Sequence, residues 1–304
     1  MHHTPPPRHL FLAVAVVAVW GINFTVIKVA LGDFPPLMFA ALRFTLAFLP
    51  AAFFLKRPAV PIGTLAAYGV FIGAGQFGLL YVAMKSDISP GMASLVLQTQ
   101  VFFTIGLSMA FAGERVKAYQ VAALALAVAG IAVIGANTGG STTAKGLVLA
   151  LVAAFSWACG NMVSKRATNV NMLAFVVWSS VFALPPLYAL TFVFEGWRDV
   201  HAGFEAASWE TWLALVYQSA GNTMFGYGIW GWLLAKHPAA SITPMALLVP
   251  VFGMASAALF LDEPLPGWKL AAAGLIIAGL AMNVVLPRLF ARRTNEALAA
   301  VEAG

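Results

Sequence analysis

The sequence has 304 residues, of which 61% are hydrophobic and only 9% are charged, and its mean hydropathy is +0.88. A typical soluble domain is about 45–50% apolar and about 25% charged, so this composition excludes an ordinary soluble fold. The formal net charge of +6 does not indicate nucleic-acid binding, because the basic residues stand singly or in pairs between apolar runs.

The apolar residues come in runs of about 20, the length that a helix needs to cross about 30 Å of hydrocarbon. In chain order we expect membrane spans at 10–31, 35–55, 62–84, 90–112, 118–136, 144–164, 172–194, 210–233, 239–261 and 267–289. The sequence therefore predicts an all-α integral membrane protein with ten transmembrane helices. We expect one five-helix repeat at 10–137, a second at 144–289, and a frayed cytoplasmic tail at 290–304.

The distribution of Lys and Arg predicts the orientation. With a cytoplasmic N-terminus, the inner segments hold eleven of these residues and the outer loops hold three. Cytoplasmic loops carry the excess of positive charge, so we expect both termini in the cytoplasm of a bacterial inner membrane. The inner residues are Arg8, Lys56, Arg57, Arg115, Lys117, Lys165, Arg166, Lys236, Arg288, Arg292 and Arg293, and the outer ones are Lys85, Lys145 and Arg198. The outer loop 195–209 is the longest.

Two sequence features recur in the same order in both halves of the chain. A tryptophan and a lysine eight residues apart occur as Trp20 and Lys28 in the first span and as Trp157 and Lys165 in the sixth. The fourth span ends in Gly113-Glu114-Arg115 and the ninth in Asp262-Glu263-Pro264. Because each half has an odd number of spans, duplication predicts an inverted repeat with a substrate site near the membrane midplane.

These features resemble the drug/metabolite transporter superfamily, in particular its ten-helix EamA-type branch. The resemblance covers residues 10–288 and includes the segment 35–44, which begins Pro35-Pro36, and the two acidic helix ends. Within that branch the sequence is most similar to bacterial aromatic and neutral amino-acid exporters, which implies efflux of amino acids or related metabolites. The small multidrug members of the superfamily use a membrane-embedded glutamate. No acid lies at hydrocarbon depth here, so proton-coupled export of lipophilic cations is disfavoured.

Amide, hydroxyl and aromatic side chains inside the spans predict an internal polar cavity, because such groups are costly against lipid unless they face protein or water. The alternative is that they serve helix packing. The candidate substrate-binding residues are Trp20, Asn23, Phe24, Gln76, Phe77, Tyr81, Ser94, Gln98, Gln100, Trp157, Asn161, Trp178, Tyr217, Gln218 and Asn222.

Arg43 lies about 12 Å into the second span, at about 1.5 Å per residue. It either pairs with a substrate carboxylate or satisfies backbone carbonyls and extends toward the interface. Pro185-Pro186 and the pair Pro244 and Pro250 remove backbone donors within spans, which predicts kinks that serve either as hinges or as static bends.

The main hypothesis is facilitative, alternating-access export without catalytic residues, metal or cofactor, by a monomer whose partners are a small molecule and membrane lipid but not nucleic acid. A nucleotide-sugar exchanger is the alternative, although it would need several basic residues in the cavity. An integral-membrane enzyme is less favoured, since the five histidines lie at the N-terminus, in a loop or at a helix end and form no HExxH motif. A channel would call for a charged ring that the sequence does not suggest.

Overall fold

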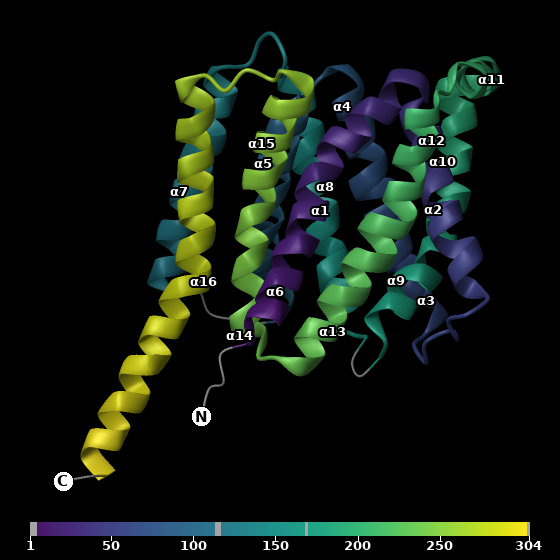
Figure 1. Ribbon diagram of the computed structural model, residues 1–304. Helices are drawn as coiled ribbons and strands as arrows, with labels where there is room; N and C mark the ends of the chain where they lie inside the picture. Colours follow the sequence, from purple (N-terminus) through teal and green to yellow (C-terminus); the bar gives the residue numbers. More distant parts are fainter. Residues whose placement is uncertain (1–4, 113–116, 168–169, 303–304) are drawn as a thin grey trace.

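The computed structural model describes residues 5–112, 117–167 and 170–302, and these residues contain helices and turns but no strand (Figure 1). In the first half the elements are α1 (Pro7–Asp33), α2 (Pro36–Ala52), α3 (Ile62–Gly69), η1 (Val70–Gly78), α4 (Leu79–Ser86), α5 (Pro90–Val96), η2 (Leu97–Thr99), α6 (Gln100–Ala112) and α7 (Ala118–Ala136). In the second half they are α8 (Ala144–Ser164), α9 (Met172–Ser180), η3 (Val181–Ala183), α10 (Leu184–Leu190), η4 (Thr191–Glu195), α11 (Gly196–Ala206), α12 (Trp209–Val216), η5 (Tyr217–Tyr227), α13 (Gly228–Lys236), α14 (Ala239–Ile242), η6 (Thr243–Leu248), α15 (Val249–Leu261) and α16 (Gly267–Glu302).

Many of these elements follow one another without a break and form long rods. Within the described residues, eight helices are long and apolar enough to cross a membrane, and Pro36–Ala52 is a shorter apolar helix. The stretch Trp209–Lys236 is not among the eight, and its π-helical centre η5 carries several buried polar residues. The predicted all-α membrane fold is confirmed, whereas the count of ten transmembrane helices and the inverted pairing of the two halves stay predictions.

Two regions expected to be irregular are helical. The predicted outer loop 195–209 contains α11, which turns away from the preceding helix at Gly196, whose φ of 77° suits glycine. Gly203 then lies against the α1–α2 connection, where a Cβ would be 2.8 Å from Pro35 Cδ. The predicted frayed tail belongs to α16, which continues helical to Glu302 (Figure 1). Strong helix formers dominate that segment, so helix propensity continues beyond the apolar run.

The predicted kinks coincide with changes of helix type. The 3₁₀ segment η3 immediately precedes the turn that contains Pro185, and η6 contains Pro244. The wider π-helical segments η1 and η5 have no proline and instead contain glycines and polar side chains. Because π-helical turns displace side chains from the regular α-helical register, they place polar groups where an α-helix would not.

Helices α1, α5 and α15 interlock through glycines. A Cβ on Gly21 would collide with Phe252 Cβ and the Val249 carbonyl, and a Cβ on Gly253 would collide with the Ser94 side chain. Small residues at such crossings allow backbones to approach closely, which is the usual means of helix association in membranes. The contact joins two helices of the first half to one of the second. Helices α7 and α16 form a separate pair beside this group (Figure 1).

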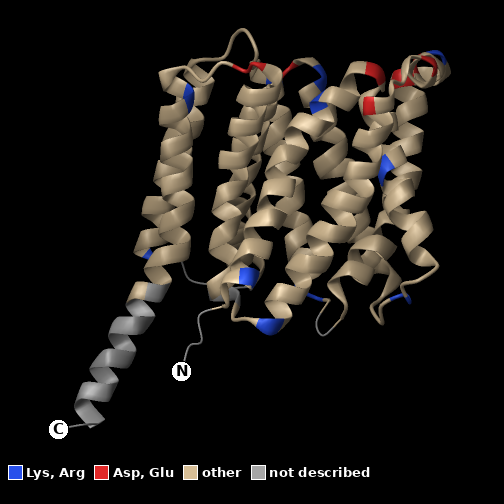
Figure 2. Cartoon of the chain, in the orientation of Figure 1, with Lys and Arg blue, Asp and Glu red and all other residues tan. Residues whose placement is uncertain are grey.

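The acidic residues coloured in Figure 2 gather at the end of the bundle away from the described N-terminus. There they cap the N-termini of helices from other parts of the chain. The Glu195 carboxylate accepts hydrogen bonds from Leu37 N at 2.6 Å and Met38 N at 3.0 Å, at the start of α2. Asp33 accepts from Ser208 N at 3.0 Å and Thr211 Oγ1 at 2.6 Å, at the start of α12. Carboxylates at these positions satisfy free N–H groups and complement the helix dipole.

Two further acids complete this arrangement. Asp87 accepts from Thr143 Oγ1 at 3.1 Å and Lys145 Nζ at 2.8 Å at the start of α8. The hydrogen bond from Lys145 is the main cause that holds the pKa of Asp87 below its ordinary value. Glu263 is buried and accepts from Gly91 N at 2.9 Å, at the start of α5, and from Lys269 Nζ at 2.9 Å. The connections at this end are therefore held by side chains from distant parts of the sequence.

Candidate functional site

Arg43 occupies a fully buried position in α2, with a side chain that is 1% exposed. Its Nη1 donates to Tyr81 Oη at 3.0 Å and its Nη2 donates to Thr223 Oγ1 at 3.3 Å. The guanidinium carbon lies 3.9 Å from the centre of the Phe77 ring and 4.7 Å from that of Phe44. Cation–π contacts of this kind contribute about 2 kcal/mol when they are desolvated. The guanidinium of Arg43 thus contacts side chains from four elements: α2, η1, α4 and η5.

The π-helical segment η5 supplies the polar side of this cluster. Tyr81 Oη donates to Gln218 Oε1 at 3.3 Å, while Thr223 Oγ1 donates to the Gln218 carbonyl at 3.0 Å. The Ser219 hydroxyl donates to the Arg43 carbonyl at 3.3 Å. Thr223 Oγ1 bonds to the carbonyl of the residue five positions earlier, which is the spacing of a π-helical turn. The widened turn therefore determines where this hydroxyl lies and allows it to accept the hydrogen bond from Arg43.

The cluster leaves hydrogen-bonding capacity unused. The donors Arg43 Nε and Gln218 Nε2 are buried without a partner. The predicted residues Asn23 in α1 and Gln76 in η1 also carry buried acceptors without a partner. None of the ion pairs found among the described residues includes Arg43. Leaving a buried charge without a counterion is strongly unfavourable, and intramembrane ionisable residues of this kind mark substrate pathways. An anionic group at this position would supply the missing counter-charge.

Comparison with known proteins identifies the family. Residues 8–136 and residues 144–285 both match the model of the EamA-like transporter family. The chain belongs to the EamA-like transporter family. The chain is 44% identical to the "Probable amino-acid metabolite efflux pump" of Salmonella typhimurium, over 90% of this chain and 94% of that protein. It is 43% identical to the protein of the same name in Escherichia coli, over 90% of this chain and 93% of that protein.

The fold of this EamA-like transporter also matches a solved crystal structure, with a TM-score of 0.61 at 19% sequence identity. The match covers 92% of this chain and 96% of the other. At this identity the likeness concerns the fold alone. Among the described residues, no group of three His, Cys, Asp or Glu side chains is placed to hold a metal ion.

A second group of predicted residues of this EamA-like transporter joins α1 to η5. Trp20 Nε1 donates to the Asn222 carbonyl at 3.2 Å, and Tyr217 Oη donates to the Val19 carbonyl at 2.7 Å. The Trp20 ring packs 5.5 Å from that of Tyr227, centre to centre. Tyr217 and Asn222 therefore lie in the π-helical segment that contacts Arg43, and Trp20 packs against it, but the hydrogen bonds that join α1 to η5 are to backbone carbonyls.

Two other predicted residues pair elsewhere, between α6 and α8. Asn161 Nδ2 donates to Gln100 Oε1 at 2.7 Å and to Thr104 Oγ1 at 3.3 Å. One turn along, Lys165 Nζ donates to Ser108 Oγ at 2.7 Å. Asn161 and Lys165 belong to the second of the two segments that share the Trp and Lys spacing, and the correspondence of this segment to the Trp20 region stays a prediction.

The remaining candidates are dispersed. Ser94 Oγ donates to the Gly91 carbonyl at 2.7 Å within the α5–α15 contact, and Trp178 Nε1 donates to the Leu55 carbonyl at 2.8 Å. Phe24 and Gln98 are buried, and Trp157 is partly buried against the core. Their role in binding stays a prediction.

The sequence did not single out three residues that the structure places in or beside the Arg43 cluster. Thr223 and Phe44 contact the guanidinium directly, and Tyr227 packs beside Trp20. A hydroxyl or an aromatic ring in an apolar run usually serves packing, so neither gives a distinct signal in a single sequence. The position of Thr223 one turn beyond Gln218 was the only available indication.

Proposed function

We propose that this protein exports amino acids, aromatic or neutral, or related small metabolites across the inner membrane by alternating access. The observation that carries the proposal is Arg43, a buried guanidinium that has no acidic partner among the described residues. The names of the two relatives, amino-acid metabolite efflux pumps, support the same substrate class.

In this proposal Arg43 binds the substrate carboxylate. The free donors Arg43 Nε and Gln218 Nε2 supply hydrogen bonds that the protein leaves unmade. Phe77, already packed on the guanidinium, and Tyr81 provide an apolar, aromatic wall for a side chain. Because the site consists of one charge and otherwise neutral groups, it binds a monoanionic carboxylate without holding it too tightly for release.

The single buried arginine also distinguishes this substrate from a nucleotide sugar. A diphosphate carries at least two negative charges and calls for several basic groups. Lys28, the other basic residue within a predicted span, donates to the carbonyls of Met84 and Lys85 at 2.9 Å each. Its ammonium group therefore binds the C-terminal end of α4. We therefore favour the carboxylate, and we propose transport without covalent chemistry.

Energy coupling and topology follow from the charges. The acidic residues coloured in Figure 2 lie at one end of the bundle, where Glu195 and Glu263 cap helices, which supports a facilitative mechanism driven by the substrate gradient. We propose that both termini lie in the cytoplasm, as the eleven-to-three distribution of Lys and Arg favours. We also propose a monomer.

Two inverted repeats are part of the proposal, at 10–137 and 144–289, with 290–304 in the cytoplasm. The packing supports it, since α1 of the first repeat lies on α15 of the second, and α8 of the second lies on α6 of the first. The first helix of each repeat thus packs on the fourth stretch of the other.

The test is counterflow of radiolabelled amino acids, including Phe, Trp, Thr and Met, in proteoliposomes of the purified protein with and without a pH gradient. We expect saturable exchange without a gradient, and no exchange of phenylalanine methyl ester, which lacks the carboxylate. If the wild-type protein moves none of the amino acids, the proposed substrate class is wrong.

The role of Arg43 is tested separately. We expect Arg43→Gln to abolish exchange and Arg43→Lys to restore part of it, while Arg57→Gln, in the connection between α2 and α3 and outside the cluster, leaves exchange unchanged. If Arg43→Gln exchanges amino acids with an unchanged KM, the carboxylate role is refuted and the export proposal survives.

A further inference from the structure

A group of basic side chains lies where α1 begins and α13 ends, apart from the Arg43 cluster. Arg8 and His9 are in the first turn of α1, Lys236 is the last residue of α13, and His237 follows it. His9 Nδ1 and His237 Nε2 are 2.6 Å apart, so the two imidazoles share a hydrogen bond across 228 positions of sequence. This contact holds the two helix ends together.

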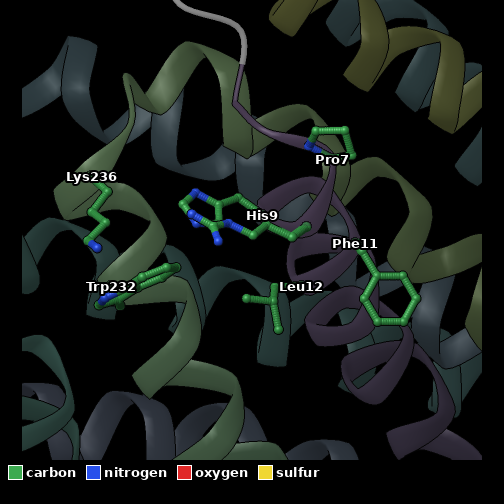
Figure 3. A pocket seen from close by; sticks show the side chains of 7 residues that line it. Pro7, His9, Phe11, Leu12, Trp232 and Lys236 are labelled. Atoms are coloured by element: carbon green, nitrogen blue, oxygen red, sulfur yellow. The ribbon is translucent and has the colours of Figure 1, made fainter.

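A pocket of about 770 Å³ opens beside this pair. It is lined by Pro7, Arg8, His9, Phe11, Leu12, Trp232 and Lys236. Figure 3 shows Lys236, Trp232 and His9 on one side and the Phe11 ring turned away from them. Lys236 Nζ lies 4.4 Å from the centre of the Trp232 ring, and the His9 ring contacts the same tryptophan edge-on at 4.9 Å.

Among the residues whose side chains the structure describes, the positive charges of this pocket have no acidic partner. The acidic residues coloured in Figure 2 lie at the opposite end of the bundle, and the ion pairs found among the described residues include neither Arg8 nor Lys236. The N-terminal N–H groups of α1 add further positive potential at the same place. An arginine, a lysine and imidazole N–H groups that converge on one pocket are the donors that bind phosphate.

The surroundings favour a lipid as the source of the phosphate. Trp232 is 38% exposed near the end of α13, and Phe11 is 73% exposed near the start of α1, one of the helices long and apolar enough to cross a membrane. Tryptophan is typical of the membrane–water interface, where phospholipid headgroups lie, and exposed Phe11 suits an acyl chain. Basic clusters next to membrane spans attract anionic lipids.

We propose that this pocket binds the phosphate group of an anionic ligand, and that a phospholipid of the surrounding membrane supplies it. Arg8 and Lys236 contact the phosphate oxygens, His9 or His237 donates a further hydrogen bond, and Trp232 and Phe11 border the glycerol and acyl portions. The ligand would bridge α1 and α13 at the same place as the histidine pair.

The experiment measures retention of phosphatidylglycerol and of phosphatidylcholine by native mass spectrometry, together with the shift in Tm that each lipid or inorganic phosphate produces in detergent. We compare wild-type protein with the double variant Arg8→Gln/Lys236→Gln. The control Lys56→Gln/Arg57→Gln also removes two positive charges, but in the connection between α2 and α3.

We expect phosphatidylglycerol to be retained and to raise Tm in the wild-type protein and the control. We expect the affinity of Arg8→Gln/Lys236→Gln to fall about tenfold or more, since each lost charge-assisted contact corresponds to about a tenfold change. Equal loss in both double variants, or equal retention of phosphatidylcholine, overturns the proposal. Stabilisation by inorganic phosphate alone, abolished only in Arg8→Gln/Lys236→Gln, supports the phosphate site and overturns the lipid as its source.

Discussion

The ion pair between Glu263 and Lys269 provides the sharpest test of how the acidic end of the bundle is held. Both side chains are buried, at 6% and 2% exposed, and Glu263 also accepts hydrogen bonds from Ser89 Oγ and Gly91 N. Replacing Glu263 by Gln leaves the Lys269 ammonium buried without its counterion. Removing one partner of such a pair costs about 3–5 kcal/mol.

The reciprocal change is milder. In Lys269→Met the Glu263 carboxylate keeps its two hydrogen-bond donors, Ser89 Oγ and Gly91 N, and stays at the positive N-terminal end of the α5 dipole. We therefore expect the free energy of unfolding to fall by about 2 kcal/mol. In the double variant no buried charge is left unpaired, and the Gln amide oxygen can still accept from Gly91 N. We expect a total loss of about 2–3 kcal/mol, against about 5–7 kcal/mol for the sum of the single losses, and therefore a coupling energy of about 3–4 kcal/mol.

The free energy of unfolding is measured by SDS titration in dodecylmaltoside micelles for the wild-type protein, the two single variants and the double variant. The matched control is the cycle Asp87→Asn and Lys145→Met, the same chemistry with Lys145 69% exposed, where we expect a coupling of about 0–1 kcal/mol. Additive losses at Glu263 and Lys269, or stronger coupling in the exposed pair, would refute the reasoning.

Three further predictions concern single positions. Gly21→Ala should destabilise the protein by about 1–3 kcal/mol, because the new Cβ has no room, whereas Gly32→Ala, with open space around it, should not; SDS titration checks both. The lowered pKa of Asp87 stabilises the fold above its ordinary value of 3.8 and ceases to do so as pH falls through the lowered value, so Tm of the wild-type protein should fall more on acidification than that of Asp87→Asn. Tyr81→Phe removes a hydrogen bond that orients Arg43 and should raise KM for amino acids about tenfold at unchanged expression; an unchanged KM would contradict this.

Hydropathy and helix periodicity were sufficient to predict the class of fold, because each span must satisfy its own backbone and therefore leaves a local signal. The positions of α1, α7 and α8 agree with the predicted spans to within a few residues. The helix α11 was missed, because its composition is nearly balanced between polar and apolar residues and a loop and a short interfacial helix look alike in hydropathy.

The candidate site was predicted only in part. Arg43, Phe77, Tyr81 and Gln218 were chosen because charged, amide and aromatic groups are unusual within spans, and the structure brings them together. Which of them meet could not be predicted, because the contacts join residues up to 180 positions apart and depend on the widened turns of η5. Helical wheels assume 100° per residue, so they misplace side chains in a π-helical segment.

The interlocked crossing of α1, α5 and α15 determines which parts of the molecule can move as a unit. Since Gly21 and Gly253 leave no gap between these helices, sliding them past one another would require their backbones to separate. Two of the three come from the first half of the chain and one from the second. In the alternating-access mechanism that we propose, these three helices would therefore move together, so one moving body would contain helices of both halves of the chain.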